Sequence, residues 1–216
     1  MKSKIFKDRA EAGLLLANEL AHYQLERPVV LAIPRGGVPV ASPVADRLRA
    51  PLDVIIVRKI GVPNQPEVAM GAVGEDETCV RDEHLIKSLG ISDAMFDALM
   101  LSEFGEVERR AHRYRKLVPR VDIGGRTVVI VDDGIATGST ALAAVRVARA
   151  HGATSIYVAV PVCSPEARRL LLYEVDDLIS LQTPDRLLAV GYYYDDFNPV
   201  LESEVETILR TPREPV

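Results

Sequence analysis

The stretch that decides the fold runs from Val128 to Thr140 and reads Val-Val-Ile-Val-Asp-Asp-Gly-Ile-Ala-Thr-Gly-Ser-Thr. Its four apolar β-branched residues are typical of a buried strand in a parallel sheet. Two adjacent carboxylates, Asp132 and Asp133, end that strand, and a short loop leads into an alanine-rich helix that Gly152 ends. The pattern therefore predicts a strand, an acidic pair, a small polar loop and a helix start in direct succession.

The loop before this helix has the composition of a phosphate site. The backbone N–H groups of Thr137, Gly138 and Ser139 are expected to point at an anion, where the positive end of the helix dipole adds to them. Gly138 permits close approach of the backbone, and the hydroxyls of Thr137, Ser139 and Thr140 are further donors. We therefore expect this loop to bind a phosphate group.

The acidic pair has a different role, because carboxylates repel phosphate. Asp132 and Asp133 can accept hydrogen bonds from sugar hydroxyls beside the phosphate, or can hold a hydrated Mg²⁺ ion. An acidic pair at a strand end also occurs in other doubly wound proteins, including phosphate-accepting signalling domains. The pair and the loop together indicate a phosphorylated sugar.

The remainder of the chain alternates between strand and helix patterns. We predict strands over 29–33, 53–57, 128–131, 155–160 and 177–181, and helices over 8–22, 38–48, 140–150 and 165–173. This alternation predicts an α/β fold with a doubly wound, mainly parallel five-stranded sheet. One domain is expected over 1–216, with a long insertion at 61–125 and a small C-terminal cap at 188–216.

The insertion is expected to hold a hairpin (69–73 with 78–81) and a long helix (92–117). Insertions of this length between sheet strands are usually lids or subunit contacts, and we expect a homodimer. Late in the helix lie Arg109, Arg113 and Lys116 with other bases. Such a run is typical of a solvated helix face, and the alternative is a clamp that closes over an anion.

Composition excludes several classes of protein. The 216 residues are 48% apolar and 26% charged, with a net charge of −5, which argues against a general nucleic-acid binder. The longest apolar run near the start, 14–17, is too short for a signal-peptide core, and no stretch is long enough to span a bilayer. We therefore expect a cytoplasmic protein without a membrane partner.

A second motif, Arg35-Gly36-Gly37, follows the first predicted strand. Its glycines can expose backbone N–H groups to an anion, and the Arg35 guanidinium suits a pair of phosphate oxygens. Alone, this tripeptide is also typical of an ordinary turn. Arg58 and Lys59 end the second predicted strand, where the alternative reading is a solvated strand end.

These motifs together resemble the 5-phosphoribosyl 1-diphosphate (PRPP) site of type I phosphoribosyltransferases. The resemblance implies that Asp132 and Asp133 bind the ribose 2′- and 3′-hydroxyls. It implies that the loop cradles the 5′-phosphate through Ala136, Thr137, Gly138, Ser139 and Thr140. Arg35, Gly36 and Gly37 match the pyrophosphate loop, which carries a strained peptide in that family, and Arg58 and Lys59 match a further basic position facing the pyrophosphate.

The implied reaction transfers the phosphoribosyl group from PRPP to a nitrogenous base and releases pyrophosphate. Mg²⁺ would be carried by PRPP, and the catalytic residues would be Arg35, Lys59, Asp132 and Asp133. Position 136 is Ala, as in adenine transferases, whereas hypoxanthine–guanine transferases have Asp there, so an oxopurine handled by that acid is disfavoured.

The acceptor base stays open. The segments Arg-Lys-Ile-Gly-Val-Pro (58–63) and Tyr-x-Asp-Phe (194–197) are similar to those of small bacterial phosphoribosyltransferase-like proteins of unassigned substrate. The alternative function is a regulator that senses PRPP without turnover and contacts RNA through the basic helix.

Overall fold

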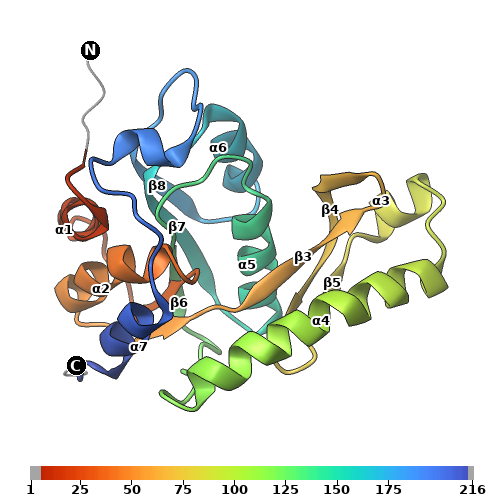
Figure 1. Cartoon of the computed structure of the whole chain (residues 1–216), viewed down its shortest axis with the longest axis horizontal. Coiled ribbons are helices and arrows are strands. Elements are labelled where there is room, and N and C mark those ends of the chain that lie inside the picture. Colours follow the sequence, from red (N-terminus) through yellow and green to blue (C-terminus); the bar gives the residue numbers. More distant parts are fainter. Residues whose placement is uncertain (1–5, 214–216) are drawn as a thin grey trace.

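A computed structural model describes residues 6–213, apart from the side chains of Pro66 and Glu67. Its centre is a parallel sheet whose strands lie in the order β2-β1-β6-β7-β8 (Figure 1). The strands are β1 (Val29–Ala32), β2 (Leu52–Val54), β6 (Thr127–Val131), β7 (Ser155–Val162) and β8 (Asp177–Gln182). The predicted five-stranded parallel sheet and the α/β fold class are therefore confirmed.

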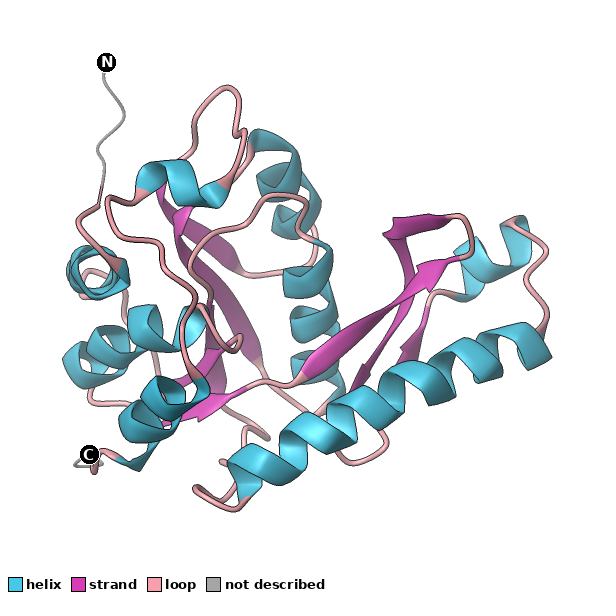
Figure 2. Cartoon of the chain, viewed as in Figure 1, coloured by secondary structure: helices cyan, strands magenta, loops and turns pink. Residues whose placement is uncertain are grey.

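Helices cover both faces of this sheet (Figure 2). Alternate residues of β1 point to opposite sides: Val30 and Ala32 share one apolar cluster with α1 (Arg9–Leu20) and α2 (Gly37–Leu48). Val29 and Leu31 share the other cluster with α5 (Ser139–Ala150) and α6 (Pro165–Leu172). Because both faces are buried, β1 and the Val128–Val131 part of β6 read as continuous apolar runs.

The connections run in opposite directions from the middle of the sheet. From β1 the chain crosses through α2 to β2, whereas from β6 it crosses through α5 to β7. The loops after β1 and β6 therefore diverge, and the crevice between them is where open α/β sheets bind ligands. Both predicted binding motifs begin at this crevice.

We call residues 57–115 the wing, because they form a second layer beside the parallel sheet (Figure 1). The wing holds an antiparallel sheet of β3 (Val57–Val62), β4 (Gln65–Gly74) and β5 (Cys79–Arg81), followed by α3 (Glu83–Ser88) and α4 (Asp93–Arg115). The predicted hairpin and long helix are confirmed. The pairing of β3 with β4 was not predicted.

One predicted strand, 53–57, is wrong in its second half. β2 ends at Val54, and Val57 already belongs to β3 of the wing. The run from Val54 to Val57 contains no turn residue, so its pattern cannot show where the chain changes sheet. As a consequence, Arg58 and Lys59 lie in the antiparallel sheet rather than at the end of a parallel strand.

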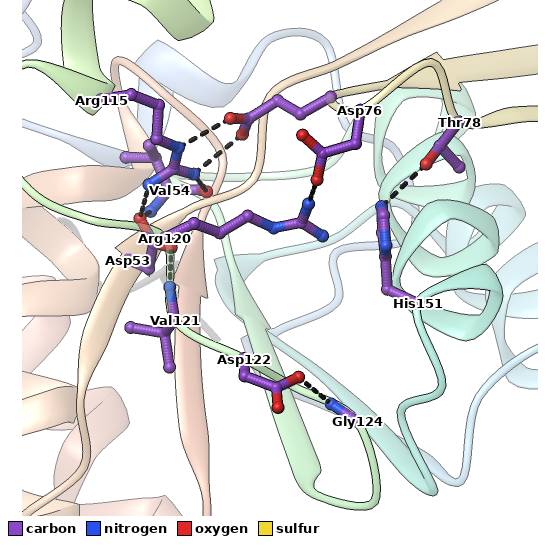
Figure 3. A network of polar contacts seen from close by, with 11 residues as sticks. Asp53, Val54, Asp76, Thr78, Arg115, Arg120, Val121, Asp122, Gly124 and His151 are labelled. Atoms are coloured by element: carbon purple, nitrogen blue, oxygen red, sulfur yellow. Dashed lines mark hydrogen bonds and ion pairs between the residues drawn. The ribbon is translucent and has the colours of Figure 1, made fainter.

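A buried polar network joins the wing to the parallel sheet (Figure 3). Arg115 donates through Nη1 to Asp53 Oδ1 at 2.6 Å and through Nε and Nη2 to the Glu75 carboxylate at 2.7 and 2.8 Å. Asp53, which is buried, also accepts the backbone N–H of Val121 at 2.9 Å. Burial lowers the pKa of Arg115, but the bonds and charges of Glu75 and Asp53 outweigh this effect and raise that pKa above its ordinary value.

The C-terminal part of the chain packs against the N-terminal part. A 3-10 turn (Val190–Tyr193) leads to Tyr194, which pairs with Phe6, and α7 (Glu202–Arg210) packs on α2. Residues 214–216 of the predicted cap lie outside the described residues. Within residues 6–213, we find no helix that combines the length and the apolar character needed to cross a membrane.

Candidate functional site

The two predicted motifs touch each other across the crevice between β1 and β6. A Cβ atom on Gly37 would lie 2.5 Å from the carbonyl oxygen of Val131, and one on Gly36 would lie 2.1 Å from Asp133 Oδ2. Only glycine fits such close contacts, so the Arg35–Gly37 loop packs directly on the end of β6. The structure therefore brings together two motifs that are almost a hundred residues apart in the sequence.

Arg35 itself is exposed, and the peptide bond between Pro34 and Arg35 is cis. The Arg35 guanidinium makes no hydrogen bond or ion pair with the described residues. Its charge is therefore available to an anion in the crevice.

The acidic pair is short of hydrogen-bond donors. Asp132 Oδ1 accepts the backbone N–H of Asp133 at 2.9 Å, and Asp133 Oδ2 accepts Arg9 Nε at 2.8 Å. Burial and the charge of Asp133 raise the pKa of Asp132 well above its ordinary value. Burial also raises the pKa of Asp133, although Arg9 opposes this effect. Hydroxyl groups of a ligand would supply donors that these carboxylates lack.

The loop after the acidic pair has the geometry of an anion site. Gly138 precedes the first residue of α5 and has a φ of 83°, in the left-handed region that favours glycine. The carbonyl of Ala136 accepts the Ser164 hydroxyl at 2.6 Å, which ties the loop to the start of α6. Thr137 and Ser139 share a hydrogen bond of 3.0 Å between their hydroxyls. Thr140 lies in the first turn of α5 and is exposed.

Arg58 and Lys59 point in different directions, because neighbouring residues of a strand face opposite sides. Lys59 Nζ lies 3.2 Å from Ser139 Oγ, at the loop after β6. Arg58 pairs with Glu103 of α4 at 2.7 Å. The sequence predicted both beside the pyrophosphate loop, whereas the structure places Lys59 at the predicted phosphate loop. Both residues, together with Pro34, line a cavity of about 730 Å³ between β3 and α4.

Sequence reasoning missed Arg9, which lies at the start of α1 and forms an ion pair with Asp133. Besides Asp133, Arg9 contacts the carbonyl of Asn198 at 2.8 Å, and its guanidinium carbon lies 3.9 Å from the centre of the Phe197 ring. The Tyr194 hydroxyl donates to the Asp133 carbonyl at 2.6 Å. Nothing near Arg9 in the sequence marks it, whereas the aromatic segment at 194–197 was a visible signal for the others.

Three basic residues of α4 pair with acidic side chains near them. Arg109 and Arg110 pair with Glu106 on the same helix, and Arg113 contacts Glu202 of α7 at 3.4 Å. Arg110 also lines the 730 Å³ cavity. This placement agrees with the predicted solvated helix face for Arg109 and Arg113.

The described residues contain no group of three or more His, Cys, Asp or Glu side chains arranged to hold a metal ion. Mg²⁺ usually keeps several waters and is held by one or two carboxylates together with substrate phosphates. Asp132 and Asp133 fit that mode, since they are adjacent at the end of β6 and the Asp133 carboxylate lies against Gly36 of the other predicted phosphate loop.

Comparison with known proteins agrees with this geometry. The family described as "Phosphoribosyl transferase domain" matches residues 4–196. A Mycobacterium tuberculosis protein, named only provisionally as a phosphoribosyl transferase, is 45% identical over 206 residues, which are 95% of this chain and 46% of that protein. The chain thus spans about half the length of that relative.

Two further proteins show how far the likeness extends. A crystal structure of a protein from Thermus thermophilus is 43% identical, with a TM-score of 0.90 over 95% of this chain and 98% of that one. A uracil phosphoribosyltransferase of Acinetobacter baylyi is 38% identical over 76 residues, 35% of each chain. From the family match over residues 4–196, we conclude that this chain belongs to the phosphoribosyl transferase domain family.

Proposed function

We propose that the protein transfers the 5-phosphoribosyl group from Mg²⁺-bound PRPP to a nitrogenous base and releases pyrophosphate. The observation that carries the proposal is the contact between the two motifs, where Gly36 lies against the Asp133 carboxylate. This contact supports a site in which one proposed anion loop lies on each side of the acidic pair. PRPP has the matching order of groups, a phosphate, a diol and a pyrophosphate.

Each group of PRPP has a proposed partner. The 5′-phosphate binds the start of α5 through Thr137, Gly138, Ser139 and Thr140, and Lys59 lies beside it. The ribose hydroxyls donate to Asp132 and Asp133. The pyrophosphate binds Arg35 and the backbone of Gly36 and Gly37, with Arg58 at the outer side of the cavity.

The reaction forms one bond and breaks another at the anomeric carbon. A ring nitrogen of the base donates its electron pair to this carbon, and the C–O bond to pyrophosphate breaks with both electrons leaving on oxygen. Any proton that this nitrogen carries is released to solvent. Because the transition state resembles an oxocarbenium ion, the protein contributes positioning and charge stabilisation. Mg²⁺ would neutralise part of the charge that collects on the leaving group.

The first experiment measures PRPP binding by calorimetry in the presence of Mg²⁺. Changing both Asp132→Asn and Asp133→Asn should weaken binding at least tenfold, because hydrogen bonds to a charged acceptor contribute about 1.5–3 kcal/mol each. A matched control is Asp195→Asn with Glu204→Gln. It removes the same number of carboxylates, but from exposed positions outside the proposed site. No PRPP binding by the unmodified protein at millimolar ligand would overturn the proposal.

The second experiment separates the enzyme from a sensor. Pyrophosphate release is measured with PRPP, Mg²⁺ and a panel of purine and pyrimidine bases. Release with one base identifies the acceptor and supports the transferase. Tight PRPP binding without release from any base would favour the alternative, a PRPP-sensing regulator.

A further inference from the structure

A second cavity, of about 710 Å³, lies at the amino ends of the parallel strands. Its walls come from the loop before β1, the end of α2 with the loop before β2, and the residue before β6. The candidate site follows the carboxyl ends of β1 and β6, so this cavity and the candidate site lie at opposite edges of the same sheet. We call this cavity the arginine pocket, because it is lined by Arg27, Arg47, Arg49 and Arg126.

Four of the residues that line the arginine pocket are arginines, and none of its lining residues is Asp or Glu. The side chains of Arg27, Arg47 and Arg49 make no hydrogen bond or ion pair within residues 6–213. Asp46, the acid beside Arg47, pairs instead with Arg213 at 2.9 Å. These three arginines therefore have no ion-pair partner within residues 6–213.

Arg126 is held in place by groups that carry no net charge. It donates to the backbone carbonyls of Arg27 at 3.1 Å, Pro28 at 3.2 Å and Asp122 at 3.4 Å. Burial and the nearby charge of Arg27 lower the pKa of Arg126, while Asp122 partly opposes them. The Arg126 guanidinium is thus positioned by backbone carbonyls and not by an ion pair, so it can still pair with an anion.

Helix electrostatics account for part of this cluster only. Arg47 lies in the last turn of α2 and Arg49 follows it, where cations interact favourably with the helix dipole. Arg27 and Arg126 belong to loops, so the dipole does not explain them. Arg27 and Arg49 also have φ values of 46° and 48°, in a region that glycine adopts far more easily than arginine. Arginine therefore occupies two positions whose left-handed backbone conformation disfavours it.

We propose that the arginine pocket binds a nucleoside polyphosphate. Guanidinium groups form paired hydrogen bonds with phosphate oxygens, and four of them match a ligand with several phosphates better than a single phosphate. The rest of the lining is largely apolar and includes Tyr23, Leu25 and Leu48, against which a flat base can pack. The volume also lies in the range of small-molecule sites. This proposal does not depend on the proposed transferase activity.

The test measures binding of ATP and GTP to the full chain by calorimetry, with inorganic tripolyphosphate as a third probe. The test variant is Arg27→Gln with Arg47→Gln, whose side chains have no partner in residues 6–213. The matched control is Arg109→Gln with Arg113→Gln, exposed bases on α4. Hydrogen exchange over 21–28 and 47–51 reports where the ligand lies.

A nucleotide that binds the unmodified protein and the control alike, and the test variant at least tenfold more weakly, supports the proposal, as does slower exchange in both segments. Equal binding by all three proteins would overturn it, because the ligand would then lie elsewhere, for example at the carboxyl edge. Absence of binding by ATP and GTP at millimolar concentration would also overturn it. Tripolyphosphate binding as tightly as either nucleotide would overturn the nucleoside part, leaving a site for inorganic polyphosphate.

Discussion

Strands β1 and β6 are buried along their whole length by apolar residues, whereas the wing meets the parallel sheet at a junction that also buries charged side chains. In β1 and β6, the buried apolar side chains stabilise the fold roughly in proportion to the apolar area that they remove from water, and no specific partner is required. At the junction, the Arg115 guanidinium satisfies both Asp53 and Glu75, so each member of the network depends on the others. The sheet should therefore tolerate conservative apolar changes, and the junction should not tolerate loss of a single charge.

The largest effect is expected from Arg115→Met, which leaves Asp53 and Glu75 as buried carboxylates without their partner. Breaking a buried pair on one side costs about 3–5 kcal/mol of unfolding free energy. Denaturant unfolding should show this loss. The control, Arg113→Met, removes an exposed contact with Glu202 and should change stability by about 0–1 kcal/mol. Equal effects of the two variants would mean that apolar contacts alone hold the wing.

The next effect concerns the carboxyl edge of the sheet, where Gly36 meets Asp133. In Gly36→Ala the new methyl group would lie 2.1 Å from Asp133 Oδ2, so the carboxylate or the loop must move. We expect Mg²⁺–PRPP to bind at least tenfold more weakly, about 1.4 kcal/mol. Gly105→Ala is the control, since nothing lies within 4 Å of its added methyl group. Unchanged affinity in a folded Gly36→Ala variant would contradict the proposed ribose site.

A third effect follows from the raised pKa values of Asp132 and Asp133. In the proposed complex, sugar hydroxyls donate to the ionised carboxylates, so the affinity for PRPP should be highest above the raised pKa. Below it a proton must leave first, and PRPP affinity should fall by up to tenfold for each pH unit and each proton released. The number of protons released on binding is obtained by comparing the calorimetric binding enthalpy in buffers that differ in ionisation heat, at pH values around the raised pKa. The Asp132→Asn variant should release fewer protons, and an unchanged release would assign the effect to the phosphates of PRPP.

The smallest effect is a gain in stability within the wing. Gly105 lies in the interior of α4, is exposed, and has open space where a Cβ would be placed. Alanine there should stabilise the protein by about 0.5–1 kcal/mol, because glycine loses more backbone entropy in a helix. Thermal unfolding detects this gain. A loss of stability would indicate that this part of α4 needs to bend.

The difference between sheet and wing also explains what the sequence could predict. Val128–Val131 and the acidic pair after it are contiguous, so strand, loop and helix start could be read directly. Strand β3 could not, because Ile55 and Ile56 continue the apolar run from one sheet into the other. Arg115 was predicted only as one base of a helix, since its partners lie 40 and 62 residues away.

The same limit applies to the candidate site. The loop residues could be identified from local composition, and the contact of Gly36 with Asp133 follows from strand order, which the alternation of elements indicates but does not fix. Arg9 could not be found at all. Its role comes from an ion pair across 124 residues and from packing on Phe197, neither of which leaves a periodic pattern.

The acidic pair described at the end of β6 also sets a conflict between stability and function. A carboxylate whose pKa is raised in the folded protein contributes stability below its unfolded pKa, and this contribution is lost as the pH rises through the folded value. Near neutral pH the ionised Asp132 therefore destabilises the free protein. Asn at this position would remove that cost and should yield a more stable protein that binds PRPP more weakly, so selection for stability alone would remove the residue that we propose to bind the sugar.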